Sequence, residues 1–188
     1  MNKIISITLI ILSVLLTVSC KKEQPSTEII THKPVEEAPK PTQKTGDYDQ
    51  TMDANWLGTT YKVVTVCEAD ETLPLVSDEN GNKFYDNKVR VSVVRNDGST
   101  FFTRTFMKSD FLPYADNLKE SKNALLGVVL DKAEGDYIYL VGSVGSPDEM
   151  SDEYVLFEIQ LSRYGKVVIK RSTRLEMESG AAESDDGV

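Results

Sequence analysis

The stretch NKVRVSVVRNDGSTFFTRTFM, residues 87–107, decides the fold. Apolar and polar side chains alternate on both sides of Asp97-Gly98, and successive side chains of a strand point to opposite faces of a sheet. Asp-Gly between two alternating runs is a strong signal for a tight β-hairpin. We therefore expect an antiparallel hairpin with one core face and one polar face. Its core face would hold three pairs: Val93 with Phe102, Val91 with Arg104, and Val89 with Phe106.

A second hairpin is predicted near the end of the same region. Its first strand alternates apolar residues with more polar ones, at Val155, Phe157, Ile159 and Leu161. The loop Arg163-Tyr164-Gly165 would place glycine at the left-handed position of a three-residue connection. Val167 and Ile169 then fall on the same face as the apolar residues of the first strand.

Shorter runs extend the β pattern on either side of these hairpins. We expect strands over 60–66, 125–130 and 137–141, the last two joined by a turn at Lys132-Ala133-Glu134-Gly135. Pro74 would confine any strand within 73–85 to a sheet edge. Short strands separated by turn signals at about every eight to twelve residues are typical of an all-β sandwich or barrel.

One short helix is predicted after the first hairpin. Asp110 is a suitable cap, Pro113 is tolerated in a first turn, and apolar residues recur at helical spacing. Those apolar residues are Phe111, Leu112, Ala115 and Leu118. The fold class that follows is mainly β: a single antiparallel β-sandwich or partly open barrel with one short helix, over residues 53–175.

The N-terminal residues indicate export and lipidation. Ile4 to Val18 is an apolar run that follows Lys3, which is the pattern of a signal peptide over residues 1–19 and is too short to span a bilayer. Ser19 then leads directly into Cys20, and this junction resembles the lipobox of bacterial lipoproteins. The resemblance implies cleavage before Cys20 and attachment of lipid to its sulfur, which would anchor the chain durably in a membrane.

The segments that flank the β-rich region are predicted to lack a core. Residues 20–52 would form the lipidated cysteine and a disordered tether, because they contain four of the seven prolines and few large apolar residues. Residues 176–188 would form a disordered acidic tail. The formal net charge of the chain is −9, and such a surface repels nucleic acid, so we expect no nucleic-acid partner.

Three stretches of the β-rich region resemble a family of small uncharacterised lipoproteins of Bacteroidetes. They are FMKSDFLPY at 106–114, LLGVVLDKAEGDYIYLVGSVGSPDEMSDEY at 125–154 and LSRYGKVVI at 161–169. None of them is a motif tied to a chemical reaction. The resemblance implies a lipid-anchored envelope protein with one β-rich domain of unknown function, located on the periplasmic or the cell-surface side of the outer membrane.

The motifs of the sequence predict no catalytic residues, no metal ligands and no cofactor. Cys67 follows a β-type run and is expected to be a buried hydrophobic residue, since the sole histidine, His32, lies outside the β-rich region. The calcium-like stretch 78–82, the acidic loop 148–153 and the carboxylates of 68–71 are better explained as polar turns and solvated loops. The glycines of 142–146 more often mark a bend than a phosphate site.

Four residues are weak candidates for ligand binding. Tyr137 and Tyr139 share one strand face, and together with Trp56 they could form an aromatic platform, although core or rim packing is the commoner role. Arg104 falls on the core face of the first hairpin and needs either a carboxylate partner or an exit to solvent.

These features predict a membrane-anchored envelope lipoprotein that acts as a non-catalytic binding or structural module. Its partners would be the membrane, through the lipid at Cys20, and an envelope protein or glycan. Two alternatives remain open at this point: a carboxylate-dependent glycan hydrolase, and a lipocalin-like carrier of small ligands. A carrier of this kind requires a closed barrel with an empty interior.

Overall fold

The structure is a computed structural model, and it describes residues 40–173. The predicted signal peptide, Cys20, His32, the first part of the tether and the acidic tail lie outside the described residues.

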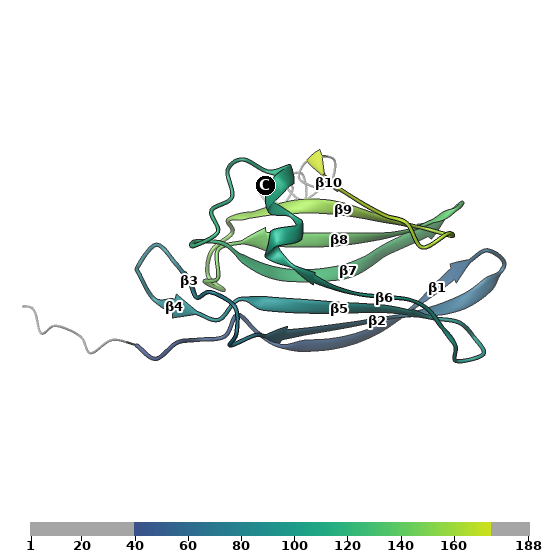
Figure 1. Cartoon of the computed structure of the whole chain (residues 1–188), viewed down its shortest axis with the longest axis horizontal. Helices are drawn as coiled ribbons and strands as arrows, with labels where there is room; N and C mark the ends of the chain where they lie inside the picture. The colour runs from purple at the N-terminus through teal and green to yellow at the C-terminus, as the bar shows by residue number, and fades with distance from the viewer. Residues whose placement is uncertain (1–39, 174–188) are drawn as a thin grey trace, which may run out of the picture. The chain divides into compact units, whose positions relative to one another are not determined.

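Two antiparallel four-stranded sheets make up most of the described region and stack as the two layers of a sandwich (Figure 1). The first sheet has the order β1-β2-β5-β6, and its strands are Tyr48–Trp56, Thr59–Ala69, Asn87–Val94 and Thr100–Met107. The second has the order β10-β9-β8-β7, and its strands, from β7 to β10, are Ala124–Glu134, Tyr137–Gly145, Tyr154–Ser162 and Val167–Arg171. Each sheet keeps two open edges, so the predicted sandwich is confirmed.

A short hairpin of β3 (Val76–Ser77) and β4 (Lys83–Phe84) lies near one end of the layers, opposite the end where β1 turns into β2 (Figure 1). This hairpin occupies the stretch that the sequence left ambiguous, and Pro74 stands just before it.

The pairing of β5 with β6 matches the expected register. Val93 pairs with Phe102, Val91 with Arg104, and Val89 with Phe106. The connection is longer than the two-residue turn that Asp97-Gly98 suggested, since it runs from Arg95 to Ser99, with Gly98 at a φ of 83°. A register shift between Val93 and Val94 absorbs the difference, which is why the core pairs are unchanged.

The second hairpin also forms as expected. Val167 pairs with Leu161 and Ile169 with Ile159, and Gly165 has a φ of 79°. By contrast, the turn predicted at 132–135 is displaced. Lys132 to Glu134 continue strand β7, and the chain reverses at Gly135 and Asp136. Gly135 has a φ of 56°, so the left-handed conformation that a two-residue turn needs is supplied by glycine.

Strand β1 begins at Tyr48, inside the segment predicted to be tether. Its full length pairs with β2, from Tyr48 opposite Cys67 to Trp56 opposite Thr59. The folded region therefore starts earlier than the predicted boundary at residue 53. Most of β1 is polar and exposed, because it is an edge strand that buries only Ala54 and Trp56.

The short helical segment is present, but it consists of two 3₁₀ turns, Lys108–Asp110 and Leu112–Tyr114. Asp110 ends the first turn, and its carboxylate accepts a hydrogen bond from the Met107 backbone N–H at 2.9 Å. The predicted helix starting from Asp110 does not form. Pro113 lies at the start of the second 3₁₀ turn, where the N–H that it lacks would have no acceptor.

Phe111 joins the helical segment to both sheets. Its ring is fully buried, 6.1 Å from the Phe106 ring centroid of the first sheet and 5.1 Å from that of Phe157 in the second. It also lies against Gly142, where an added Cβ would come within 2.7 Å of the ring. The sandwich core therefore includes a side chain from the connection between the sheets, and glycine in β8 makes room for it.

A buried ion pair fixes the start of this connection. Lys108 Nζ lies 2.9 Å from Asp86 Oδ2, and both side chains are almost completely buried. The ammonium also donates to the carbonyl oxygens of Glu120 and Asn123, so its three N–H groups are all used. The other carboxylate oxygen of Asp86 accepts from the backbone N–H groups of Asn87 and Leu125. Such full hydrogen bonding compensates the cost of burying both charges.

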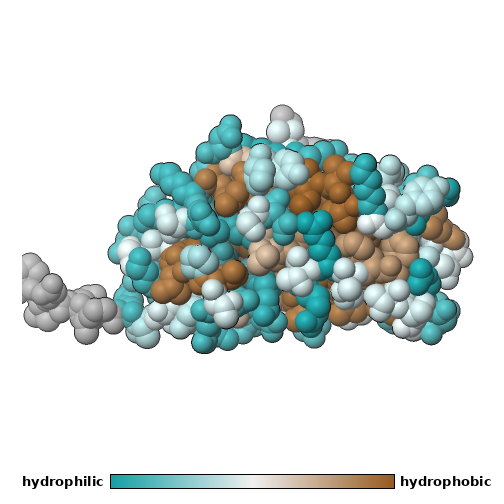
Figure 2. Space-filling model, in the orientation of Figure 1, coloured by the Kyte–Doolittle hydropathy of each residue, from teal (hydrophilic) through white to brown (hydrophobic). Residues whose placement is uncertain are grey.

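Hydrophilic side chains separate the hydrophobic patches on the face shown in Figure 2. The large apolar side chains with the lowest exposure lie between the sheets, among them Phe106, Phe157, Ile138, Leu140 and Leu161.

Lys108→Met is expected to lower the free energy of unfolding by about 3–5 kcal/mol, because it leaves the Asp86 carboxylate buried without its cation. Lys62→Met is the matched control, since Lys62 forms an exposed pair with Asp53 at 3.2 Å and should cost less than about 1 kcal/mol. Urea unfolding of the two variants measures both values. Equal, small losses would show that the buried pair does not support the fold.

Candidate functional site

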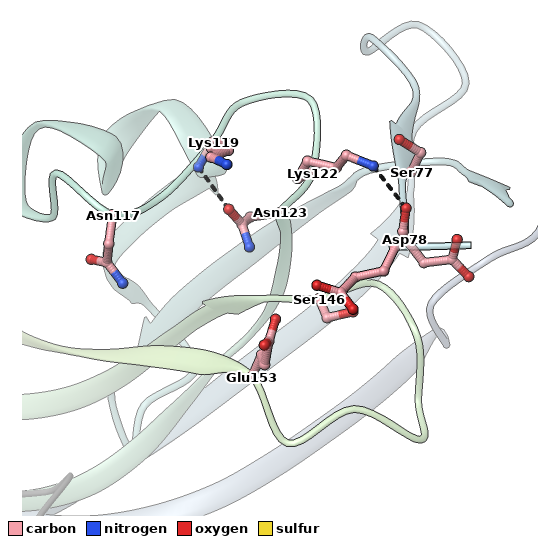
Figure 3. A pocket seen from close by; sticks show the side chains of 9 residues that line it. Ser77, Asp78, Asn117, Lys119, Lys122, Asn123, Ser146 and Glu153 are labelled. Carbon is pink, nitrogen blue, oxygen red and sulfur yellow. Dashed lines mark hydrogen bonds between the residues drawn. The ribbon is translucent and has the colours of Figure 1, made fainter. Parts of the chain in front are cut away.

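A polar cavity of about 480 Å³ lies where three loops meet (Figure 3). The loops are the β3–β4 turn, the connection from the helical segment to β7, and the β8–β9 loop. Its lining consists of Ser77, Asp78, Glu79, Asn117, Lys119, Lys122, Asn123, Ser146 and Glu153. No aromatic side chain is among these residues, and most of them are charged or carry an amide.

The middle loop is held in place from both sides. Lys108 binds the carbonyl oxygens of Glu120 and Asn123 from the core. From the cavity side, Lys122 Nζ donates to the Asp78 carbonyl at 2.9 Å, and the Ser77 N–H donates to the Ser121 carbonyl at 3.0 Å. The cavity wall is therefore preorganised by backbone contacts that involve buried groups.

The β3–β4 turn uses the Asp78 carboxylate internally. Its two oxygens accept from the backbone N–H and the side-chain amide of Asn82, at 2.8 and 2.6 Å. Burial alone would raise the pKa of Asp78, but these hydrogen bonds and those from the neighbouring backbone hold the pKa below its ordinary value. The calcium-like stretch 78–82 is thus a self-contained polar turn, as predicted, with Gly81 at a φ of 82°.

The remaining charges of the cavity are not paired with one another. Within the described residues, the ammonium of Lys119 and the carboxylates of Glu79 and Glu153 form no ion pair or hydrogen bond. Figure 3 shows the Asn123 amide and the Glu153 carboxylate pointing toward the same space. Asn123 Oδ1 accepts from the Lys119 backbone N–H at 2.7 Å, which leaves its NH₂ group as a free donor.

A second hollow of about 360 Å³ adjoins the first. Asn117, Asn123 and Glu153 line both, so the two form one continuous cleft. The second hollow adds Leu118, Gly145, Asp152, Tyr154 and Val155. The cleft therefore passes from a strongly charged part to one that contains the half-exposed ring of Tyr154.

The four binding candidates proposed from sequence lie elsewhere. Trp56 is 3% exposed, and its indole N–H donates to the Gly135 carbonyl at 3.1 Å, so it is a core residue. Tyr137 and Tyr139 lie on the outward face of β8 with ring centroids 6.0 Å apart. No aromatic platform unites them with Trp56 in the described structure.

Arg104 has both a carboxylate partner and access to solvent, the two alternatives expected for it. Its guanidinium lies 2.7 Å from Asp110 Oδ1 and 4.9 Å from the Phe106 ring centroid. Its side chain remains 37% exposed at the edge strand, so it reaches solvent while its stem covers the core.

The acidic stretch 68–71 is only partly the solvated loop that was predicted, because Glu68 belongs to strand β2 and only Asp70 and Glu71 lie in the turn after it. The Asp70 carboxylate accepts from the hydroxyl and backbone N–H of Thr72, and it lies 3.3 Å from Lys88 Nζ. These contacts, with the Thr72 hydroxyl foremost, lower the pKa of Asp70, which is opposite to what a general acid requires.

Close packing explains two glycines that could suggest a phosphate site. An added Cβ at Gly145 would lie 2.2 Å from the Glu153 carbonyl, and the one at Gly142 would meet Phe111. Both glycines belong to strand β8 and let neighbouring groups approach the backbone closely.

Cys67 is buried on the inner face of β2, with 1% of its surface exposed. Burial, reinforced by nearby carboxylates, raises the pKa of its thiol to about 12. The neutral thiol is therefore strongly favoured, which agrees with the expected role as a small hydrophobic residue.

Two kinds of feature are absent from residues 40–173. They contain no group of three or more His, Cys, Asp or Glu side chains placed to hold a metal ion. In the same part of the chain, no helix has the length and apolar character needed to cross a membrane.

The cleft has no signature in the sequence, because its residues are far apart in the chain. Asp78 and Glu79, Lys119 and Lys122, and Glu153 come from three separate loops. Two of these loops are rich in acidic residues, but no sequence signal links Lys119 and Lys122 to either of them.

Comparison with known proteins gives one family match. A family model described as a domain of unknown function, DUF4738, matches residues 29–169. No curated protein matches the chain.

The raised pKa of Cys67 predicts a pH dependence of stability. Between the ordinary value of 9.0 and about 12, the folded protein keeps the thiol proton and the unfolded chain releases it, so stability falls as pH rises. Relative to Cys67→Ala, the wild type should lose about 1.4 kcal/mol per pH unit in this window. Urea unfolding of both proteins at several pH values gives the comparison, in which other titrating groups cancel. Parallel profiles would contradict the assignment.

Proposed function

The chain belongs to the DUF4738 family, a domain family of unknown function, and we propose that it is a non-catalytic binding module anchored to the outer membrane by a lipidated Cys20. The observation that carries the binding role is the preformed polar cleft at one end of the sandwich. Its walls present unpaired donors and acceptors to solvent, while the polar groups just behind them are satisfied.

The chemistry of the described residues supports binding more than covalent catalysis. The buried thiol of Cys67 favours its neutral form, and the described residues include no histidine that could activate a nucleophile. The Asp78 carboxylate is committed to its own turn. What remains in the cleft is a set of groups suited to hydrogen bonds and ion pairs with a polar ligand.

A glycan hydrolase remains the second candidate, because Glu79 and Glu153 both line the larger cavity. Two carboxylates that flank a bound sugar are the minimum that such an enzyme needs. The lipocalin-like alternative loses its support, since the sheets are open and the space between them is filled by side chains such as Phe106 and Phe157.

Membrane attachment and export rest on the N-terminal sequence. The apolar run that ends at Ser19-Cys20 and the proline-rich segment that follows support a lipid anchor with a spacer. The resemblance to Bacteroidetes lipoproteins supports the same location. We place the domain on the periplasmic or the cell-surface side of the outer membrane.

A panel of soluble oligosaccharides and short peptides should reveal saturable binding at the cleft. With the full-length protein, we expect amide NMR shifts at residues 117–123 and 146–154 and no change in the mass of the ligand. Asn123→Leu removes the free NH₂ donor and should weaken binding by about tenfold or more.

Thr105→Leu is the matched control for that experiment, because Thr105 is exposed on β6 and lies outside the cleft. Cleavage of a ligand that is abolished by Glu79→Gln or Glu153→Gln would establish the hydrolase instead. Shifts confined to the opposite end of the sandwich would refute the cleft as the binding site.

Cys20→Ala should release the protein from the membrane fraction of its native cells. The reason is that the lipid would have no sulfur to which it could attach, whereas the folded domain is unchanged. Mass spectrometry of the wild-type N-terminus should find acyl chains on Cys20, and Cys67→Ala serves as the matched control. An unmodified thiol at Cys20, or a retained leader in a cytosolic fraction, would contradict the anchor.

A further inference from the structure

We propose that the larger cavity binds the two charged ends of a short zwitterionic peptide, with the ligand's carboxylate on the lysine wall and its ammonium on the glutamate walls. This inference rests on the proposed binding function and names the class of ligand.

The cationic wall comes from one loop. Lys119 and Lys122 lie on the connection between the helical segment and β7, and both line the cavity. Lys122 uses one N–H on the Asp78 carbonyl, which leaves two for a ligand. The hydrogen bonds of Lys119 are made by its backbone N–H and carbonyl within the loop, so its whole ammonium group is available. Figure 3 shows the Lys122 side chain directed to Asp78, so Lys119 is the cation of this loop that can turn fully to a carboxylate of the ligand.

The anionic walls come from the other two loops. Glu79 follows Asp78 in the β3–β4 turn, and Glu153 ends the β8–β9 loop. Neither carboxylate has a partner within residues 40–173. Ionised carboxylates only accept hydrogen bonds, so their natural complement is a donor with positive charge.

The separation of the two signs is the informative feature. Neither lysine forms an ion pair with Glu79 or Glu153, although all four residues line one cavity. A ligand with one charge of each sign can bridge the walls and form a charge-assisted hydrogen bond on each side. A ligand with a single charge would place that charge opposite one wall and leave the other wall without a partner.

The neutral groups suit the middle of a peptide better than a sugar ring. The free NH₂ of Asn123 can donate to a backbone carbonyl of the ligand. The larger cavity has no aromatic side chain on which a sugar ring could stack. Its volume of about 480 Å³ is in the range of small-ligand sites.

Isothermal titration calorimetry of the full-length protein at low ionic strength tests the proposal with alanyl-alanine as the probe. Its N-acetyl and C-terminal amide derivatives each lack one charge, and each should bind about tenfold or more weakly. The neutral disaccharide N,N′-diacetylchitobiose should give no saturable signal.

Two substitutions assign the ends of the probe. Lys119→Met should weaken alanyl-alanine but leave the affinity of the amide derivative almost unchanged, because that derivative has no carboxylate for Lys119 to bind. Glu153→Gln should weaken the binding of alanyl-alanine but leave the affinity of the N-acetyl derivative almost unchanged, because that derivative has no ammonium group for Glu153 to bind. Lys166→Met and Asp49→Asn are the matched controls, since both residues are exposed and lie outside the cavity.

Each outcome separates the ligand class from the proposed function. Tight binding of the disaccharide with no response to alanyl-alanine overturns the zwitterionic ligand and leaves the binding module intact. Equal binding of the dipeptide and both derivatives also overturns it. If alanyl-alanine fails to bind, the ligand class is wrong, and the wider panel of oligosaccharides and peptides decides separately whether the cleft binds anything.

Discussion

The ammonium group of Lys108 is the interaction on which the arrangement of the loops depends. It sits in a buried position where Asp86 and two carbonyl oxygens use its three N–H groups. Those carbonyls belong to Glu120 and Asn123, in the loop that forms one wall of the cleft. A single buried charge thus links the start of β5, the helical segment and the cleft wall. Removing it would leave an unpaired carboxylate in the core, which is far more costly than losing an exposed ion pair.

The hydrophobic core and the cleft share the same connection between the sheets. Phe111 enters the core between Phe106 and Phe157, and Gly142 makes space for its ring. Just beyond, the chain turns outward and presents Asn117, Lys119 and Lys122 to solvent. The packing of one aromatic ring therefore helps to determine where polar groups reach the surface. The two ends of the sandwich differ accordingly: one ends in hairpin turns such as the one between β7 and β8 (Figure 1), and the loops at the other end line the cleft.

Unpaired charged side chains on a rigid surface lose conformational entropy only when a bound ligand orders them further. The cleft walls are already held by backbone hydrogen bonds to Lys108 and Lys122, so binding would have to order mainly side-chain ends. This is why a modest polar site can be useful to a domain with no reactive thiol and no exposed catalytic constellation among its described residues. A tether to a membrane would add to such a site by raising the local concentration of the domain near surface ligands.

The amino-acid sequence by itself determined the strands whose alternation is strong. The β5–β6 and β9–β10 hairpins have the expected pairs, because a slip by one residue would expose Val89, Val91 and Val93. It also identified Cys67 as a core residue. The sequence did not predict strand β1, because its residues are mostly polar. The turn after β1 also contains Leu57 at a φ of 50°, where Asn or Asp is usual. Local propensity likewise favoured an α-helix at 110–118, where the structure has only 3₁₀ turns.

Only the tertiary structure decided the site. The candidate aromatic residues lie apart, because Trp56 is buried in the core, whereas Tyr137 and Tyr139 lie on the outer face of β8. The cleft combines loops that are separated in sequence by the strands between them. The order of residues along the chain does not indicate that these loops lie close together in space. Lys108 could not be distinguished from the exposed lysines by type or by neighbours. Its burial follows from the position of Asp86 and the carbonyls around it, which the folded chain alone brings together.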